Sequence, residues 1–227
     1  MCSLNFAKVV KYIEGFDFEE FFNYRNVDTF LNYLNEVSIE YRQQEWACYY
    51  GATKLVIIIN EEDYVIKIPF NSTENWNDDY DENPYVPFYG APAATCWDYC
   101  EVEKERFALA KENHFDKFFA ETVLSYVTNN DIRIYTQPKC EICSICPARK
   151  TNSNKNFKFF REWYDGEYVP IDSVNWLNTF IDFYGLDALK NFLHFLEKND
   201  WADDLSNNNI GFYKVYPVLI DYSSYWE

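Results

Sequence analysis

The sequence predicts an α+β fold, because segments with helical periodicity and segments rich in strand-forming residues occupy separate stretches of the chain. Apolar residues recur at helical spacing in residues 3–45, 99–113, 174–184 and 187–198. Short β-branched and aromatic runs separated by turn residues lie between the first two and predict antiparallel strands. The chain has 227 residues, 48% of them hydrophobic, which suits one large domain or two small lobes with apolar cores.

The first 45 residues are expected to form a pair of helices. Phe30, Leu34 and Tyr41 recur at helical spacing. Asp28 is a candidate N-cap, because its carboxylate can accept hydrogen bonds from free backbone N–H groups. Phe16 and three further phenylalanines add an aromatic face before that helix. We expect both helices to pack on the strands that follow.

Three strands are predicted at residues 46–50, 55–59 and 64–68. Gly51 and the polar turn at 60–63 separate them. Because short turns of this kind join antiparallel neighbours, the three runs are expected to form an antiparallel meander.

A long polar loop at 71–98 separates this meander from a helix predicted at 99–113. One face of that helix is expected to carry Cys100, Glu103, Phe107 and Ala110. Two more strands are expected at 120–127 and 132–137. The mixture of Pro, Cys, Asn and Lys at 138–158 is typical of a linker or an insert.

The last predicted elements are helices at 174–184 and 187–198, followed by a short two-stranded piece. The buried stripe of the second helix is expected to consist of Leu189, Phe192, Leu193 and Leu196. Asp204 and Asn209 lie five residues apart before the first of the two strands. Asp221 comes directly after the apolar run that forms the second.

This order of elements resembles the protein kinase-like fold, and it is most similar to small divergent kinase-like proteins of bacteria and their phages. The resemblance covers about residues 46–227. It implies a bilobal protein with an antiparallel-sheet N-lobe at 46–137 and a truncated, mostly helical C-lobe at 138–227, preceded by an N-terminal helical extension at 1–45. Such a protein binds Mg·ATP between its lobes, either as a phosphotransferase or as a degenerate pseudokinase.

The resemblance implies a role for five residues. Lys67, on the third strand, would contact the α- and β-phosphates of ATP, and Glu103 would hold that lysine in place. Asp204 would be the catalytic base that accepts the proton of a substrate hydroxyl. Asn209 and Asp221 would bind Mg²⁺, an ion that prefers oxygen ligands.

The residues themselves leave alternatives open. An ammonium group on a buried strand is costly unless it is paired, so Lys67 needs a carboxylate; Glu103 is the best candidate and Glu105 the second. The alternative is a lysine at a strand edge whose ammonium group extends into water. For residues 204–221 the alternative is an Asn-rich turn with solvated Asp residues.

The region expected to hold ATP departs from the kinase pattern. A Gly-x-Gly-x-x-Gly loop is missing from the sequence and Gly51 stands alone, so Lys54 is expected to compensate with its charge. The adenine would lie against the backbone of 135–138, which includes Gln137. Because six residues follow Asp221, we expect no room for an activation segment or for helices that dock peptide substrates.

The formal net charge of −17 supports a second function class. With 20 Lys and Arg against 37 Asp and Glu, direct binding to the backbone of DNA or RNA is not expected. The acidity suits solubility. It also suits a phage-encoded binding module that inhibits a host defence enzyme by occupying its basic, nucleic-acid-binding surface. The partner would then be a basic protein.

The compartment sets the chemistry of the seven cysteines. The N-terminus lacks a signal-peptide pattern and no apolar run approaches the ~20 residues of a membrane span, so a cytoplasmic protein without membrane contact is expected. Cys140, Cys143 and Cys146 could hold Zn²⁺ with a fourth ligand, but we favour free thiols in a linker. His114 and His194 are the only histidines, and neither is expected to act in catalysis.

Overall fold

The computed structural model describes residues 3–16, 27–51, 53–69, 98–129, 131–142, 171–201 and 207–223. Its helices and antiparallel sheets confirm the predicted α+β class. The chain forms two compact units, and each is assembled from separate stretches of sequence. The described residues of the first unit come from 3–109 and 121–139, and those of the second from 110–120 and 140–223.

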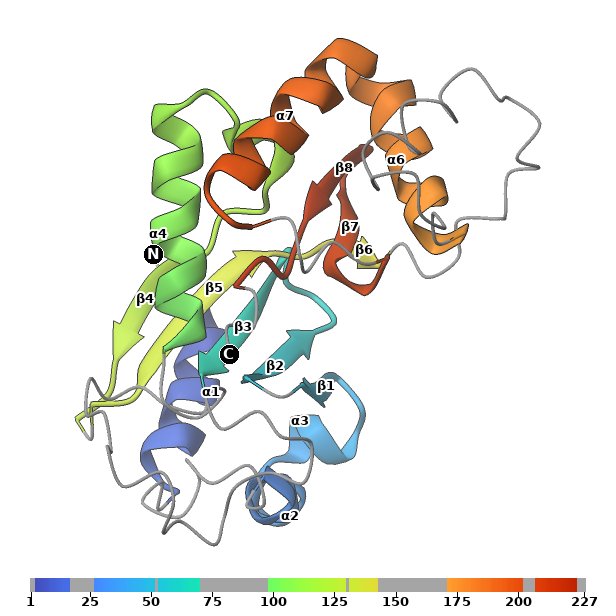
Figure 1. Cartoon of the computed structure of the whole chain (residues 1–227). Helices are drawn as coiled ribbons and strands as arrows, with labels where there is room; N and C mark the ends of the chain where they lie inside the picture. Colours follow the sequence, from blue (N-terminus) through green and yellow to red (C-terminus); the bar gives the residue numbers. More distant parts are fainter. Residues whose placement is uncertain are drawn as a thin grey trace, which may run out of the picture. The chain divides into compact units, whose positions relative to one another are not determined.

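The first unit contains a five-stranded antiparallel sheet in the order β1-β2-β3-β5-β4 (Figure 1). Its strands are β1 (Trp46–Tyr50), β2 (Lys54–Ile59), β3 (Tyr64–Pro69), β4 (Val123–Val127) and β5 (Arg133–Pro138). Between β3 and β4 the chain forms helix α4 (Tyr99–Glu112). These predictions are confirmed, except that β4 begins three residues late. The residues before it, Phe119 and Ala120, belong to the second unit. There Phe119 forms a β-bridge with Leu219, and the backbone N–H of Ala120 donates to the carbonyl oxygen of Leu219.

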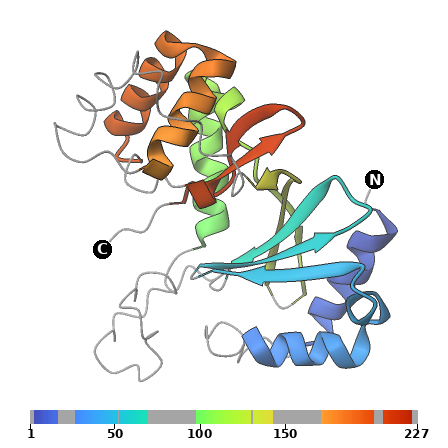
Figure 2. The same ribbon diagram turned by 90° about the vertical axis from the view of Figure 1, so that its right-hand side faces the viewer.

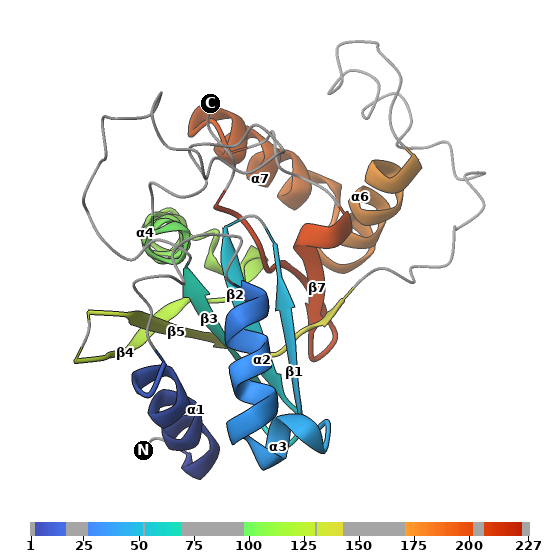
Figure 3. The ribbon, with the colours of Figure 1, turned by 90° about the horizontal axis from the view of Figure 1, so that it is seen from below.

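Helices α1 (Leu4–Glu14) and α2 (Val27–Val37) cover one face of this sheet (Figures 2 and 3), and the short helix α3 (Ile39–Arg42) leads into β1. Successive strand residues point to opposite faces, so every second residue of β2 points to this face. The buried side chains of this core include Phe6, Val9, Ile13, Phe30, Leu34, Leu55, Ile57, Ile59, Ile66 and Ile68. The N-terminal helices therefore share one hydrophobic core with the strands.

The start of α2 differs from the sequence prediction. The helix begins at Val27, so Asp28 lies in its first turn and is not the N-cap. An acidic side chain in the first turn still favours the helix, because it lies near the positive end of the helix dipole. Phe16 packs edge-on against Phe30 with ring centroids 5.2 Å apart, and the three phenylalanines after it lie outside the described residues.

The opposite face of the sheet carries polar side chains, and α4 lies over it; in Figure 2 this helix is on the other side of the sheet from α1 and α2. Lys67 of β3 pairs with Val56 of β2 and with Tyr135 of β5, so these three side chains share a face. Lys54 and Gln137 are two residues from Val56 and Tyr135, which places them on that face too. The two faces therefore differ: one is apolar, and the other carries Lys54, Lys67 and Gln137 beside apolar side chains such as Val56.

The second unit contains a three-stranded antiparallel sheet in the order β6-β7-β8 and two helices (Figure 1). Its elements are β6 (Glu141–Ile142), α6 (Ile171–Tyr184), α7 (Leu186–Lys198), β7 (Ile210–Tyr213), β8 (Tyr216–Leu219) and the short 3-10 helices η4 (Asp116–Phe118) and η5 (Asn207–Asn209). The predicted stripe of α7 is confirmed, because all four of its residues are buried. No helix within the described ranges is long and apolar enough to span a membrane.

Strand β6 lies in the segment predicted to be a linker or an insert, and the linker prediction is wrong for residues 141 and 142, which belong to the small sheet. Glu141 and Ile142 pair with Phe212 and Gly211 of β7. A Cβ atom on Gly211 would lie 2.8 Å from Cβ of Cys140 and 3.1 Å from the carbonyl oxygen of Glu141. Glycine here lets the two strands approach closely, and this tertiary effect is not visible in the local composition.

Phenylalanine rings form the core of the second unit, and Phe192 lies at its centre. The centroid of its ring is 4.3 Å from that of Phe118, 5.5 Å from that of Phe119 and 6.1 Å from that of Phe180. Aromatic pairs in such geometries contribute about 0.5–1.5 kcal/mol each beyond the area they bury. The cluster joins α7 to α6 and to η4.

Candidate functional site

Lys67 and Glu103 form a buried ion pair in the first unit. The Nζ atom of Lys67 donates hydrogen bonds to Oε2 of Glu103 at 2.9 Å and to Oε1 at 3.2 Å. Glu103 is fully buried and Lys67 is 4% exposed. Glu105, the second candidate, is exposed on another face of α4. The predicted pairing of Lys67 with Glu103 is therefore confirmed.

Lys54 joins the same carboxylate. Its Nζ atom donates to Oε1 of Glu103 at 2.6 Å, and its side chain is buried. Lys54 is opposite Pro69 in the β2–β3 ladder, so it is the diagonal neighbour of Lys67 on the polar face. The sequence predicts Lys54 beside the phosphates and does not predict this bond. Its place beside Lys67 depends on the register between β2 and β3, which the local pattern of β2 does not fix.

Thr122 and Gln137 complete the hydrogen bonding around Glu103. The Oγ1 atom of Thr122 donates to Oε2 of Glu103 at 2.7 Å, and Nε2 of Gln137 donates to Oγ1 of Thr122 at 3.0 Å. Glu103 thus accepts four hydrogen bonds, which matches the number of lone-pair sites on a carboxylate. The side chain of Gln137, expected near adenine, belongs to this buried network. Because each of these acceptor sites is used by a hydrogen bond, the position of the carboxylate is fixed.

A second polar cluster anchors the start of α4. Oδ1 of Asp98 accepts from the backbone N–H groups of Cys100 and Glu101, so Asp98 caps the helix. The hydroxyl of Tyr135 lies 2.6 Å from Oδ2 of Asp98 and 2.8 Å from Oε2 of Glu101, and its proton is shared between the two carboxylates. Burial raises the pKa of Asp98 and that of Tyr135. This cap holds α4 on β5 one turn before Glu103.

Two of the described thiols, Cys48 and Cys100, are buried and protonated, and the zinc prediction stays untested. Burial raises the pKa of Cys48 to about 12 and the pKa of Cys100 well above its ordinary value, so neither is a thiolate near neutral pH. Of the three cysteines predicted as possible Zn²⁺ ligands, Cys140 is described, whereas Cys143 and Cys146 lie outside the described residues. Within the part of the chain that the structure describes, no three metal-binding side chains gather.

Asn209 and Asp221, the predicted Mg²⁺ ligands, lie at one end of the β7–β8 hairpin in the second unit. Ile210 pairs with Leu219, and the backbone N–H of Ile220 donates to the carbonyl oxygen of Asn209 at 2.8 Å. Asn209 therefore faces Ile220, and Asp221 is the next residue. Both side chains are half-buried. Asp204, the predicted catalytic base, lies outside the described residues.

Gly51 closes the turn between β1 and β2. Its backbone N–H donates to the carbonyl oxygen of Lys54 at 3.1 Å. A Cβ atom added there would meet no described atom within 4 Å, so steric space does not require glycine at this position. A contact with phosphate stays a prediction for this residue.

No known protein-family model matches this chain, and neither a curated protein nor a solved structure matches it. The chemistry of the site is therefore inferred from the side chains themselves. On the polar face of the sheet, two ammonium groups are held beside each other by one carboxylate. Such a pair of cations can bind anionic oxygen atoms, phosphate among them.

Proposed function

We propose that this protein is kinase-like and binds Mg·ATP, either to transfer a phosphoryl group or as a degenerate pseudokinase. Lys67 is the proposed phosphate-contacting lysine, Asn209 and Asp221 are the proposed Mg²⁺ ligands, and Asp204 is the proposed catalytic base. The observation that carries the proposal is the buried ion pair between Lys67 and Glu103.

The ion pair supports the proposal because stability alone does not account for it. A buried salt bridge is often no more stable than apolar residues of the same volume, since both charges lose their hydration. A kinase needs this arrangement for another reason: a strand lysine holds the phosphates, and a helix glutamate orients that lysine. Here Lys67 is on the third strand and Glu103 is on the helix that follows it.

Two further observations support the same proposal. The order β1-β2-β3-β5-β4, with α4 inserted between β3 and β4, is the arrangement expected of a kinase-like N-lobe. In the second unit the hairpin brings Asn209 and Asp221 to the same end. A carboxylate and an amide oxygen are ligands that suit Mg²⁺.

Mg·ATP is expected to raise the melting temperature of the protein, and Lys67→Met is expected to remove most of that increase. A ligand at 100 times its Kd stabilises the folded state by about 2.7 kcal/mol. The measurement is thermal unfolding with Mg·ATP at about 1 mM, the upper end of usual KM values. Lys111→Met, which changes an exposed lysine of α4, should keep the full increase. An unchanged melting temperature in the native protein, or an equal increase in Lys67→Met, would contradict the proposal.

Two more variants separate the active from the degenerate form. Asp221→Ala should abolish the part of the increase in melting temperature that depends on Mg²⁺. Release of ADP by the native protein, absent from Asp204→Ala, would identify a phosphotransferase, whereas nucleotide binding without ADP release would identify a pseudokinase.

The net charge of −17 favours one second candidate, an acidic module that occupies the basic surface of a host defence enzyme. The immobilised protein should capture such an enzyme, and the captured amount should fall steeply as the salt concentration rises above about 0.1 M. Added salt shortens the Debye length, which is about 10 Å at 0.1 M, and so screens the attraction between the two surfaces. Duplex DNA should compete for the same surface. Capture should survive the double variant Asp204→Ala plus Asp221→Ala, and loss of capture in that variant would rule the candidate out.

A further inference from the structure

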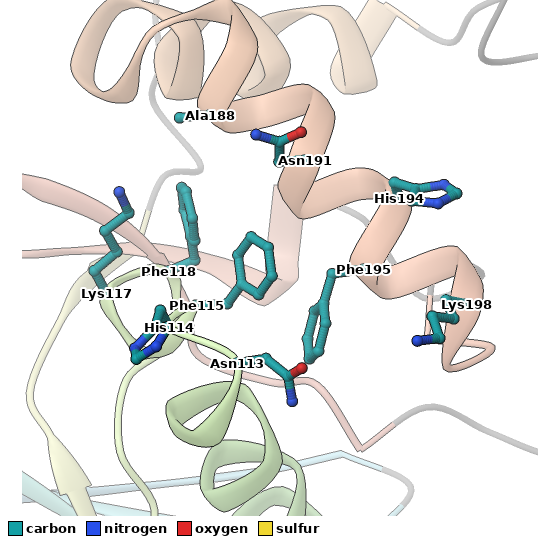
Figure 4. Close-up of a pocket in the computed structure, with 10 residues that line it drawn as sticks. All are labelled: Asn113, His114, Phe115, Lys117, Phe118, Ala188, Asn191, His194, Phe195 and Lys198. Atoms are coloured by element: carbon teal, nitrogen blue, oxygen red, sulfur yellow. The ribbon is translucent and has the colours of Figure 1, made fainter.

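A pocket of about 480 Å³ opens in the second unit between the segment after α4 and helix α7 (Figure 4). Residues 113–115, 117 and 118 form one side of it. One face of α7 forms the other, through Ala188, Asn191, Phe195 and Lys198 at successive turns. This volume falls within the range of small-molecule sites, about 300–1,000 Å³. None of these residues belongs to the proposed ATP site.

Three phenylalanines form the floor of the pocket. The rings of Phe115 and Phe195 stack with centroids 4.6 Å apart, and the ring of Phe118 lies 6.2 Å from that of Phe115 (Figure 4). Phe192 backs this floor from the core, 4.3 Å from Phe118. A rigid aromatic floor suits a planar ring, because aromatic groups stack on one another favourably.

Basic side chains surround this floor in a protein that is strongly acidic. Lys117, Lys198 and both histidines of the chain, His114 and His194, line the pocket. No Asp or Glu is among its described lining residues. Lys117 and Lys198 extend from opposite sides of the phenylalanine rings (Figure 4), and the Nζ atom of Lys117 lies 5.0 Å from the centroid of the Phe118 ring. The pocket therefore gathers two ammonium groups and two imidazoles in a negative molecule.

The outer edge of the pocket is more solvated than its floor. His194 is exposed, and its Nδ1 atom lies 3.6 Å from Oε2 of Glu197. Asn191 adds an amide donor on the same helix. Ammonium, imidazole and amide donors around an apolar floor fit a ligand whose one end is aromatic and whose other end is anionic. A phosphate group, with several acceptor oxygens, uses such a set of donors best.

We propose that this pocket binds a small aromatic phosphate, with its ring on Phe115 and Phe195 and its phosphate held by Lys117 and His114. Phenyl phosphate is the simplest probe of this chemistry. It has neither a purine nor a triphosphate, so its binding is independent of the Mg·ATP proposal and the two can fail separately.

The two histidines make the test direct, because both line the pocket. In protein labelled with ¹⁵N only at histidine, phenyl phosphate should shift the imidazole signals of His114 in a saturable way. Inorganic phosphate and phenol, which each lack one half of the ligand, should bind at least about tenfold more weakly, a loss of about 1.4 kcal/mol. Absence of a saturable shift at about 10 mM phenyl phosphate, where even a millimolar ligand is bound, would overturn the proposal. Equal affinity for inorganic phosphate would overturn it as well.

Matched variants separate binding from folding. Lys117→Ala should weaken phenyl phosphate about tenfold, whereas Lys111→Ala, an exposed lysine of α4 outside the pocket, should have no effect. His114 ends α4 with a left-handed backbone, φ 63°, which glycine adopts without strain. His114→Gly should therefore fold at least as stably as the native protein and still lose affinity, read from the His194 signal. Retained affinity in His114→Gly, or equal losses in both lysine variants, would contradict the proposed site.

Discussion

Replacing Glu103 with glutamine is expected to lower the free energy of unfolding by about 3–5 kcal/mol, because it leaves buried ammonium groups without their shared carboxylate. Glutamine has nearly the same shape, so little packing is lost. It carries one acceptor oxygen where Glu103 presents two, and its amide nitrogen would place a donor against the donors Lys54, Lys67 or Thr122. Denaturant unfolding followed by tryptophan fluorescence and circular dichroism measures the effect.

Glu105→Gln is the matched control for this prediction. It makes the same chemical change on the same helix at an exposed position, and surface substitutions of this kind stay within about 0.5 kcal/mol. If the two variants unfold at the same denaturant concentration, the network around Glu103 does not hold the first unit together. That outcome would also weaken the nucleotide proposal, which depends on an oriented Lys67.

Phe192→Ala is expected to cost about 3–5 kcal/mol in the second unit, the range found when a fully buried phenylalanine is truncated. Its ring contacts the rings of Phe118, Phe119 and Phe180, so the cavity left behind would border all three. The neighbouring rings are not expected to move in and fill this cavity, because they belong to different elements that hold one another in place. The same unfolding measurement reports the loss.

Phe183→Ala provides the comparison for this variant. Phe183 is on α6 in the same unit and is 46% exposed, so truncating it should change stability by about 0.5 kcal/mol or less. A Phe192→Ala protein as stable as Phe183→Ala would show that the aromatic cluster is not the core of the unit. Because Phe192 also backs the pocket floor, this variant should weaken phenyl phosphate along with stability.

The pairing of Lys67 with Glu103 could be predicted from the sequence because two independent constraints agreed. A lysine flanked by apolar strand residues needs a buried carboxylate, and Glu103 shares a helical face with Cys100 and Ala110, which are buried. That Asn209 and Asp221 lie at the same end of the hairpin could also be predicted, since residues flanking the two strands of a tight hairpin come to the same end.

Lys54, Thr122 and Gln137 could not be placed in this network from local patterns. Their positions depend on the register between β2, β3 and β5, and a shift of one residue would move each side chain to the opposite face. The N-cap role of Asp98 was missed because it ends a long polar segment that reads as a loop. The pocket had no local signal, because His114 and His194 are 80 residues apart in the sequence and meet through tertiary packing.

The interleaving of the two units has a practical consequence for dissecting this protein. Between residues 109 and 140 the chain passes from one unit to the other three times. A fragment ending at residue 139 would keep the five-stranded sheet but also carry Phe115, Phe118 and Phe119 without the helices that bury their rings. Such exposed rings promote aggregation. Isolating the first unit therefore requires excision of 110–120 and its replacement by a polar bridge, and isolating the second requires the same treatment of 121–139, because no single truncation point yields an intact half.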